Sequence, residues 1–165
     1  MGDKIISITL WGNTAKKGKW IDWYKDTKKI ANNMGYELTH IGIQNQSFSD
    51  GKIRTVSRME KKILESIEKG DCPQDFSCFV LPSDFRSASF DYTLLFDRTE
   101  NDISILISEN DYEKFDENEL LNTFKQYIDY ECGEMYEVSR KEMPLIYAAT
   151  RRSDYVKSYK HIKDL

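Results

Sequence analysis

The fold is decided by the stretch 88-ASFDYTLLFDRTENDISILIS-108, which has the pattern of two strands joined by a polar turn. In its first part apolar and polar residues alternate, as they do in a strand that buries one face. The apolar members of this alternation are Ala88, Phe90, Tyr92, Leu94 and Phe96. The second part, 103–107, is rich in isoleucine, whereas residues 97–102 contain no apolar side chain. The pattern therefore predicts a β-hairpin whose turn, 97–102, is exposed to solvent.

Amphipathic helices are predicted on both sides of this hairpin in the chain. A hairpin alone is only marginally stable in water, so its apolar face needs a cover. Helical spacing of apolar residues predicts helices over 19–34, 57–69 and 117–132, each followed by a glycine. The capping-box spacing occurs twice, in the pairs Ser57/Glu60 and Asp116/Glu119. We therefore expect three helices to pack on the sheet.

Further strands are predicted over 4–11, 36–43, 78–81 and 135–139. The succession strand, helix, strand over residues 4–43 implies a right-handed parallel crossover. Residues 145–149 have the pattern of a strand or of a helical turn, and the tail from Ser153 that of a short docked helix or of a disordered segment. We predict one α+β domain over 1–165, with a mixed β-sheet and a central antiparallel hairpin packed against about three amphipathic helices.

Composition excludes several classes of protein. With 39% hydrophobic residues the 165-residue chain is in the globular range, long enough to bury a core without cross-links. Three cysteines without a CxxC motif and two histidines argue against a disulfide framework and a zinc site. The N-terminus leads straight into a strand, and no apolar run approaches 18 residues. We expect a cytoplasmic protein that does not contact the membrane and needs no cofactor or metal.

Charge is distributed unevenly along the chain. The net charge is −4, yet residues 71–150 contain 6 Lys and Arg against 18 Asp and Glu, while both flanking segments are positive overall. Such blocks are commonly solvated faces. They also form surfaces that attract a partner of opposite charge, because a field of one sign raises the rate of encounter.

The loop 12–19, GNTAKKGK, resembles a phosphate-binding loop between a strand and a helix. The match fails twice, since five residues separate Gly12 from Gly18 and Trp20 occupies the place of the metal-binding Ser or Thr. Three lysines beside a helix start still leave anion binding open, next to the simpler interpretation as a basic loop.

No catalytic motif is present. His40 alternates with Leu38 on a predicted strand, as a structural histidine does, and Cys72 and Cys78 have no adjacent basic residue to activate them. The lysines of the first helix lack the interleaved exposed aromatics of nucleic-acid-binding modules. We therefore expect neither an enzyme nor a nucleic-acid-binding protein.

Three features give the chain a resemblance to immunity proteins of bacterial polymorphic-toxin and contact-dependent inhibition systems. These are Leu10-Trp11-Gly12 after the first strand, the tryptophan-rich first helix, and an acidic half with an aromatic-rich sheet. The resemblance extends over the whole chain without a diagnostic motif. It implies a non-enzymatic protein that binds a cognate toxin domain and blocks its active site or its access to substrate.

The leading hypothesis is therefore a toxin-neutralising protein whose acidic segment contacts a basic toxin surface. The candidate partner-binding residues are Asp97, Glu100, Asp102, Glu109, Asp111, Tyr112 and Glu113. Tyr112 is either an aromatic anchor for the partner or a structural residue under the third helix. Two other hypotheses are a small enzyme or binding protein for a phosphorylated ligand at loop 12–19, and an adaptor subunit of a larger assembly. An exposed strand edge at the hairpin would also permit a symmetric dimer.

Overall fold

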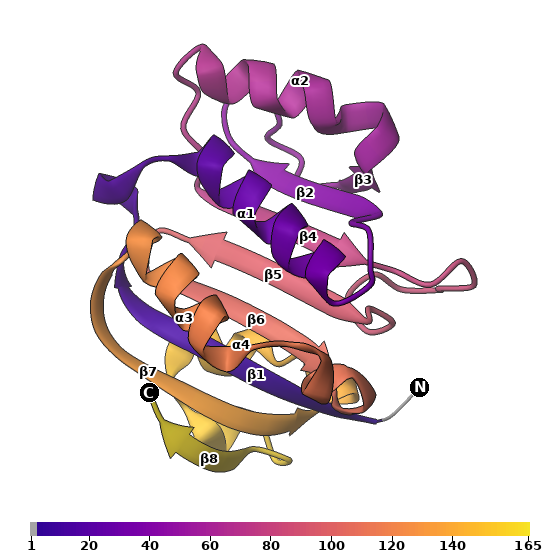
Figure 1. Ribbon diagram of the computed structural model, residues 1–165, viewed down its shortest axis with the longest axis vertical. Coiled ribbons are helices and arrows are strands. Elements are labelled where there is room, and N and C mark those ends of the chain that lie inside the picture. The colour runs from indigo at the N-terminus through magenta and orange to yellow at the C-terminus, as the bar shows by residue number, and fades with distance from the viewer. Residues whose placement is uncertain (1–2) are drawn as a thin grey trace.

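Eight strands form one sheet in the order β3-β2-β4-β5-β6-β1-β7-β8, and each neighbouring pair is antiparallel. The computed structural model describes residues 3–165 (Figure 1). The strands are β1 Lys4–Asn13, β2 His40–Gln44, β3 Ile53–Thr55, β4 Asp75–Val80, β5 Leu94–Thr99, β6 Asp102–Ser108, β7 Asp129–Ser139 and β8 Lys160–Asp164. The α+β class is therefore confirmed, with a sheet that is larger than a hairpin and antiparallel rather than mixed.

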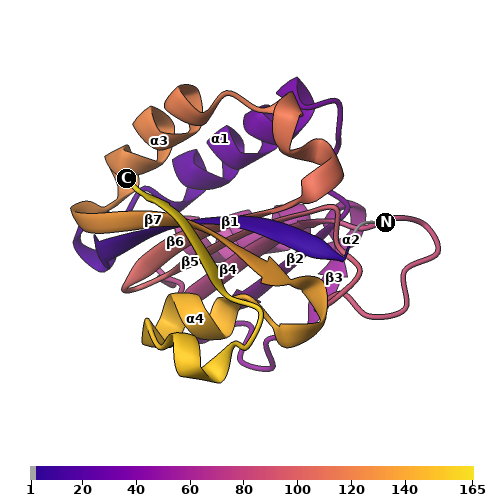
Figure 2. The same cartoon turned by 90° about the horizontal axis from the view of Figure 1, so that it is seen from below.

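Helices lie on both faces of the sheet. The α-helices are α1 Trp20–Asn33, α2 Val56–Glu68, α3 Glu117–Phe124 and α4 Leu145–Thr150. Short 3-10 helices are η1 Ala15–Lys17, η2 Glu109–Lys114, η3 Lys125–Tyr127, η4 Arg140–Glu142 and η5 Ser153–Tyr155. Figure 2 shows α1 and α3 above the sheet and α4 below it. No helix within residues 3–165 combines the length and the apolar character needed to cross a membrane.

The hairpin β5–β6 lies at the centre of the sheet, as predicted, but it is shorter and more deeply buried than the sequence suggested. Its first strand begins at Leu94, because Asp91 accepts hydrogen bonds from the amides of Arg86 and Ser87 and so closes a turn before it. Phe90, expected in the core, is half buried in that loop. The prediction that 97–102 is an exposed turn is wrong at Asp97, Arg98 and Asp102, which are 4%, 0% and 5% exposed.

Both faces of the central strands are buried. On the face covered by α1, α2 and α3, the strands contribute Ile8, Leu10, Phe76, Phe96, Ile103, Ile105 and Ile107 to one large cluster. On the face covered by α4, they contribute Ile5, Trp11, Phe79, Leu95, Leu106, Tyr136 and Val138 to a second cluster. Alternation along each strand thus supplies two cores rather than one core and one solvated face.

The helix α1 agrees with the prediction, and its face of Trp20, Trp23, Tyr24, Thr27, Ile30 and Ala31 is buried. The strand expected at 36–43 begins only at His40. Strands β1 and β2 are parallel to each other, since four antiparallel pairings link them, but β6, β5 and β4 lie between them. The connection through α1 therefore crosses three strands instead of joining neighbours.

The helix predicted over 117–132 is wrong in its second half. It ends at Phe124, and the chain passes through η3 into the long strand β7. Gly133, which suggested a helix end, lies in β7, where an added Cβ would be 3.0 Å from the Leu10 side chain and 3.1 Å from the Thr9 carbonyl oxygen. This glycine marks the close approach of two strands, which a sequence pattern does not distinguish from a helix stop.

The two capping predictions differ in outcome. The Asp116 carboxylate accepts from the amides of Asn118 and Glu119, so the N-terminus of α3 is capped as expected. The helix α2 begins at Val56 with Thr55 before it and no side-chain cap, so the Ser57/Glu60 box is absent. Glu60 instead accepts a hydrogen bond from the Tyr24 hydroxyl at 2.5 Å and pairs with Lys28 at 2.9 Å.

The C-terminal segment adds a helix and a strand. Residues 145–150 form α4, which resolves the two alternatives for this stretch in favour of a helical turn. The tail forms η5 and then the edge strand β8 beside β7, so neither a docked helix nor disorder describes it. The last residue is held by a hydrogen bond from the Leu165 amide to the Gly133 carbonyl at 3.0 Å.

Candidate functional site

The predicted partner-binding residues do not form one surface. Glu100 is exposed in the β5–β6 turn, whereas Glu109 and Glu113 are exposed in η2, at the opposite end of β6. A strand of seven residues separates the two groups, which corresponds to roughly 20 Å. Asp97, Asp102 and Asp111 are buried, because all three lie in or against the sheet and not in a solvated loop. The exposed acidic patch expected over 97–113 is thus divided into two ends and a buried part.

Asp97 and Asp102 belong to a row of carboxyl groups on the α4 face. Asp97 accepts a hydrogen bond from the Ser77 hydroxyl at 2.6 Å. Burial and then the neighbouring Asp75 carboxylate raise the pKa of Asp97 well above its usual range. Burial also raises the pKa of Asp102 to about 6. None of these three carboxylates is in an ion pair within residues 3–165, although the charge of Arg151 acts on Asp102 and lowers its pKa.

Asp111 and Tyr112 are tied into the structure at the other end. Asp111 accepts from the Tyr36 hydroxyl at 2.5 Å and pairs with the Lys114 ammonium at 2.8 Å. The Lys114 ammonium also donates to the Tyr36 hydroxyl at 3.0 Å, and its contacts with Asp111 and then Tyr36 raise the pKa of Lys114. Tyr112 is half buried, its ring centroid lies 5.1 Å from that of Phe115, and its hydroxyl lies 3.4 Å from the Met135 sulfur. These contacts agree with the structural alternative for Tyr112.

A groove beside this acidic segment is the best candidate for a partner-binding site. It has a volume of about 380 Å³ and separates the C-terminal end of α1 from the start of α3. Its lining residues are Ile30, Asn33, Met34, Lys114, Phe115, Asp116, Glu119 and Leu120. We call it the α1–α3 groove. Half of these lining residues are apolar and half are polar, a combination found in pockets that bind an anchor residue of a partner.

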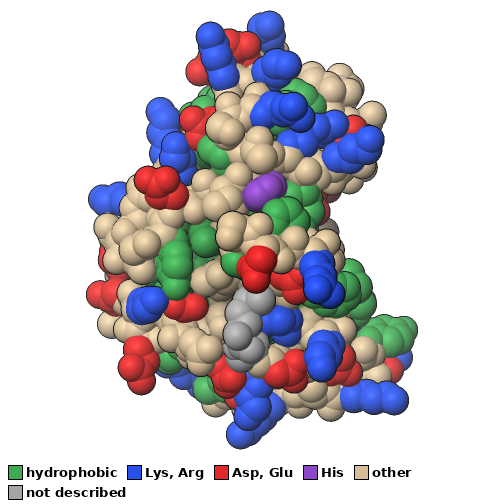
Figure 3. Space-filling model, turned by 90° about the vertical axis from the view of Figure 1, so that its right-hand side faces the viewer, with side chains coloured by type: hydrophobic (Ala, Val, Ile, Leu, Met, Phe, Trp, Pro, Cys, Tyr) green, Lys and Arg blue, Asp and Glu red, His purple; other side chains and the backbone are tan. Residues whose placement is uncertain are grey.

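The rim of the α1–α3 groove is negatively charged. Asp116 and Glu119 are exposed, and neither is in an ion pair within the described residues. The one cation in the lining, Lys114, is paired with Asp111. Basic side chains gather elsewhere, and Figure 3 shows them at the end of the molecule formed by α2 and β3. Sequence reasoning missed Asp116 and Glu119 as site residues, although their exposure follows from their place on the polar side of α3.

The loop 12–19 does not form a cradle of free amides. The amides of Gly12, Thr14, Lys16, Lys17 and Gly18 all donate to acceptors within the protein. The carbonyl oxygens of Thr14 and Gly18 accept from the guanidinium of Arg98, which stacks 3.8 Å from the Trp20 ring centre. Burial lowers the pKa of Arg98 to about 10. The loop is therefore an internal binding site for Arg98, and its lysines are exposed side chains around it.

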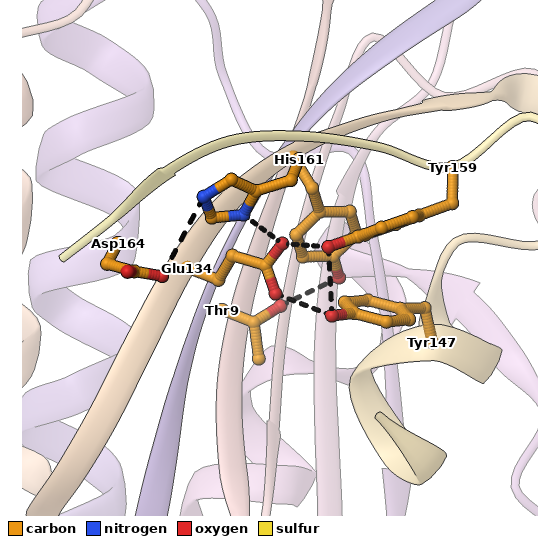
Figure 4. Close-up of polar contacts among 7 residues, drawn as sticks. Thr9, Glu134, Tyr147, Tyr159, His161 and Asp164 are labelled. Atoms are coloured by element: carbon orange, nitrogen blue, oxygen red, sulfur yellow. Dashed lines mark hydrogen bonds and ion pairs between the residues drawn. The ribbon is translucent and has the colours of Figure 1, made fainter. Parts of the chain in front are cut away.

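A polar network joins β7, α4 and β8 (Figure 4). The Glu134 carboxylate, 7% exposed, accepts from the Tyr147 hydroxyl at 2.5 Å and also from the Tyr159 hydroxyl. His161 Nδ1 lies 2.8 Å from the same carboxylate, which raises the pKa of His161. Every member contacts another part of the same chain, so we assign the network to the attachment of the C-terminal segment.

The histidine and cysteines that the sequence suggested to be structural were His40, Cys72 and Cys78. His40 is half buried, its ring lies 5.1 Å from that of Phe85, and burial lowers its pKa. Cys78 is buried and its pKa is raised, whereas Cys72 and Cys132 are exposed. Among residues 3–165 no group of three His, Cys, Asp or Glu side chains is placed to hold a metal ion.

Comparisons of the chain with models of protein families, with curated proteins and with solved structures found no match.

Proposed function

We propose that this protein is an immunity protein that binds a cognate antibacterial toxin domain at the α1–α3 groove and so neutralises it. The observation that supports the proposal is a groove of about 380 Å³ that is lined by both apolar and polar side chains. Its rim carries the carboxylates of Asp116 and Glu119, which are in no ion pair within the described residues. Such a site suits a basic surface from which an apolar or long cationic side chain projects, because the stem packs on the apolar lining residues and the charge meets the rim.

The protein would neutralise the toxin by covering its functional surface and not by catalysing a reaction. Many toxin domains that act on nucleic acids or other anionic substrates need a basic surface for substrate binding. A protein that places carboxylates on that surface competes directly with the substrate. Exposed Glu109 and Glu113 in η2 extend the acidic region beyond the groove and would speed the encounter of the two proteins.

The alternative of a phosphorylated ligand at loop 12–19 loses support, because five amides of this loop already donate within the protein. No specific contact favours the adaptor hypothesis, so the immunity function is the one put forward.

The proposal is tested by co-expression with the toxin domain encoded next to the gene. The groove variant combines Asp116→Asn, which keeps the helix cap, with Glu119→Lys. A matched control combines Glu68→Gln with Glu65→Lys, two exposed residues of α2 with the same total change in charge. We expect cells with the control to survive and cells with the groove variant to die at equal protein levels. Equal survival would remove the groove from the mechanism, and death with the wild-type protein would contradict the immunity function.

A further inference from the structure

A second groove lies on the α4 face, where the end of β1, the β5–β6 turn and the C-terminal end of α4 meet. Its volume is about 390 Å³, which is within the range of small-ligand sites. Its lining residues are Trp11, Gly12, Asn13, Asn101, Asp102, Glu131, Ala148, Ala149, Thr150 and Arg151. We call it the Trp11 groove. It shares no residue with the α1–α3 groove, so it is a separate site.

The aromatic wall of this groove is fixed in position. The Trp11 side chain is only 7% exposed, and its indole Nε1 donates to the Ala148 carbonyl oxygen at 2.8 Å. The Tyr147 ring packs edge-on against it, with the ring centres 6.1 Å apart. The indole therefore offers a preorganised surface to a planar group, because binding there requires no rearrangement of the tryptophan.

The chain itself places a guanidinium on that wall. The Arg151 guanidinium carbon lies 4.3 Å from the centre of the Trp11 ring. Arg151 is exposed, its backbone adopts the left-handed conformation with φ of 55°, and it takes part in none of the ion pairs among residues 3–165. Its side chain stacks on the indole, and its positive charge lowers the pKa of Asp102. An incoming cation at the same place would therefore take over both interactions.

Two carboxylates give the groove a preference for cations. Asp102 lies beside Trp11 in the pairing of β1 with β6 and is 5% exposed, and Glu131 is exposed at the opening. Neither is in an ion pair within the described residues, so their negative charge exceeds the single positive charge of Arg151. The charge of Arg151 offsets only part of the cost of burying Asp102, whose pKa stays raised, and a further cation in the groove would lower this cost. An anionic ligand would add to the repulsion.

We propose that the Trp11 groove is a guanidinium-binding site whose occupant is an arginine side chain of a partner protein. The incoming guanidinium stacks on Trp11 in place of Arg151, and its nitrogens donate to Asp102 and Glu131. Guanidinium suits this arrangement better than ammonium, because it is planar, stacks on indole and donates in two directions. The Asn13 and Asn101 side chains supply further polar contacts at the opening. The inference does not require that the partner is a toxin.

The test uses N-acetyl-arginine methylamide as a probe and the neutral citrulline analogue as its control. Binding is followed by the indole N–H signal of Trp11 in NMR spectra, assigned through Trp11→Phe. We expect the arginine probe to shift this signal in a saturable way and the citrulline analogue to leave it unchanged.

Two variants separate a cation site from other interpretations. Arg151→Ala removes the internal competitor, so the affinity for the arginine probe should rise by about two- to fivefold. Asp102→Asn removes the buried charge and should lower that affinity by a similar factor. The control Arg152→Ala, in which the lost arginine pairs with Asp154, should leave the affinity unchanged. The proposal is overturned if the probe shifts the signal in neither the wild type nor Arg151→Ala, if citrulline binds equally well, or if Arg151→Ala weakens binding.

Discussion

The two faces of the sheet are built from the same strands and each buries an apolar cluster, but only the α4 face also buries a row of polar side chains. Towards α1, α2 and α3 the strands present isoleucine, leucine and phenylalanine, and the aromatic residues of α1 complete the layer. Towards α4 the same strands present a buried polar row, which comprises Ser7, Thr9, Asp97, Asp102, Ser104, Glu134 and Tyr136. Polar alternation in a strand therefore does not imply contact with water, because a distant segment of the chain can cover the polar face.

The largest loss of stability is expected from a substitution on the apolar face. Trp23 is 0% exposed and contacts Trp20, Phe76 and Phe124. Trp23→Ala should lower the free energy of unfolding by about 3–5 kcal/mol, because it leaves a large cavity. Phe90→Ala, at a half-buried loop position, should cost clearly less. Urea denaturation of both variants measures the difference, and equal losses would contradict the assignment of the core to the α1 face.

On the polar face, by contrast, a substitution is expected to raise the free energy of unfolding. The pKa of Asp97 is raised in the folded state, so ionisation destabilises the fold as the pH rises from about 4 through that raised pKa. Asp97→Asn keeps an oxygen for Ser77 and removes this cost, and it should stabilise the protein at about pH 8 by ~1–3 kcal/mol. Urea denaturation at about pH 5 and pH 8 measures the effect.

The exposed Glu100 provides the control for Asp97. Glu100→Gln should change stability little at either pH, because this side chain is in water. A loss of stability of Asp97→Asn at the higher pH would show that Asp97 is charged and well compensated in the folded protein.

A smaller, local effect is expected where the polar face meets the C-terminal strand. The Glu134 carboxylate raises the pKa of His161, and Asp164 Oδ1 lies 3.8 Å from the other ring nitrogen. The ion pair therefore stabilises β8 fully at pH values below about 6.5, the pKa of histidine in the unfolded chain. This stabilisation is lost as the pH rises through the raised pKa of His161 in the folded protein. Hydrogen-exchange protection of the β8 amides should fall over this range in the wild type. It should depend less on pH in His161→Gln, and an equal dependence in both proteins would contradict the role of this pair.

Local patterns predicted the elements that local forces determine. The helix α1 was predicted because its apolar residues recur at helical spacing, and the Asp116 cap because all its residues lie within the four positions 116–119. The central hairpin was predicted from its isoleucine-rich arm and polar turn. The end of α3 was not, because Gly133 serves a contact with Leu10 and Thr9, more than 100 residues away in the chain.

The candidate site could be predicted only in part for the same reason. The acidic segment that borders the α1–α3 groove is evident in the sequence, but the burial of Asp97 and Asp102 depends on tertiary packing. Arg98, expected in a solvated turn, is fully buried because it inserts between Trp20 and the loop 12–19. The groove itself arises from the packing of α1 beside α3, which no local pattern specifies.

The smallest effect on stability is expected from the rim of the α1–α3 groove. Asp116→Asn with Glu119→Lys changes exposed charges, so the free energy of unfolding should change by only ~0–1 kcal/mol. This separates the exposed carboxylates, which we assign to binding, from the buried carboxylates of the polar face, which we assign to the fold. Urea denaturation of this variant, in parallel with the matched α2 control, measures the change in the free energy of unfolding.

Toxin binding at the α1–α3 groove can be measured through the association rate constant with the toxin domain encoded next to the gene. At low salt the Asp116→Asn/Glu119→Lys variant should associate about tenfold more slowly than the matched Glu68→Gln/Glu65→Lys variant. The gap should narrow as salt rises, because screening shortens to about 8 Å at ~0.15 M. Equal association rates of the two variants at low salt would contradict the assignment of the α1–α3 groove as the toxin-binding site.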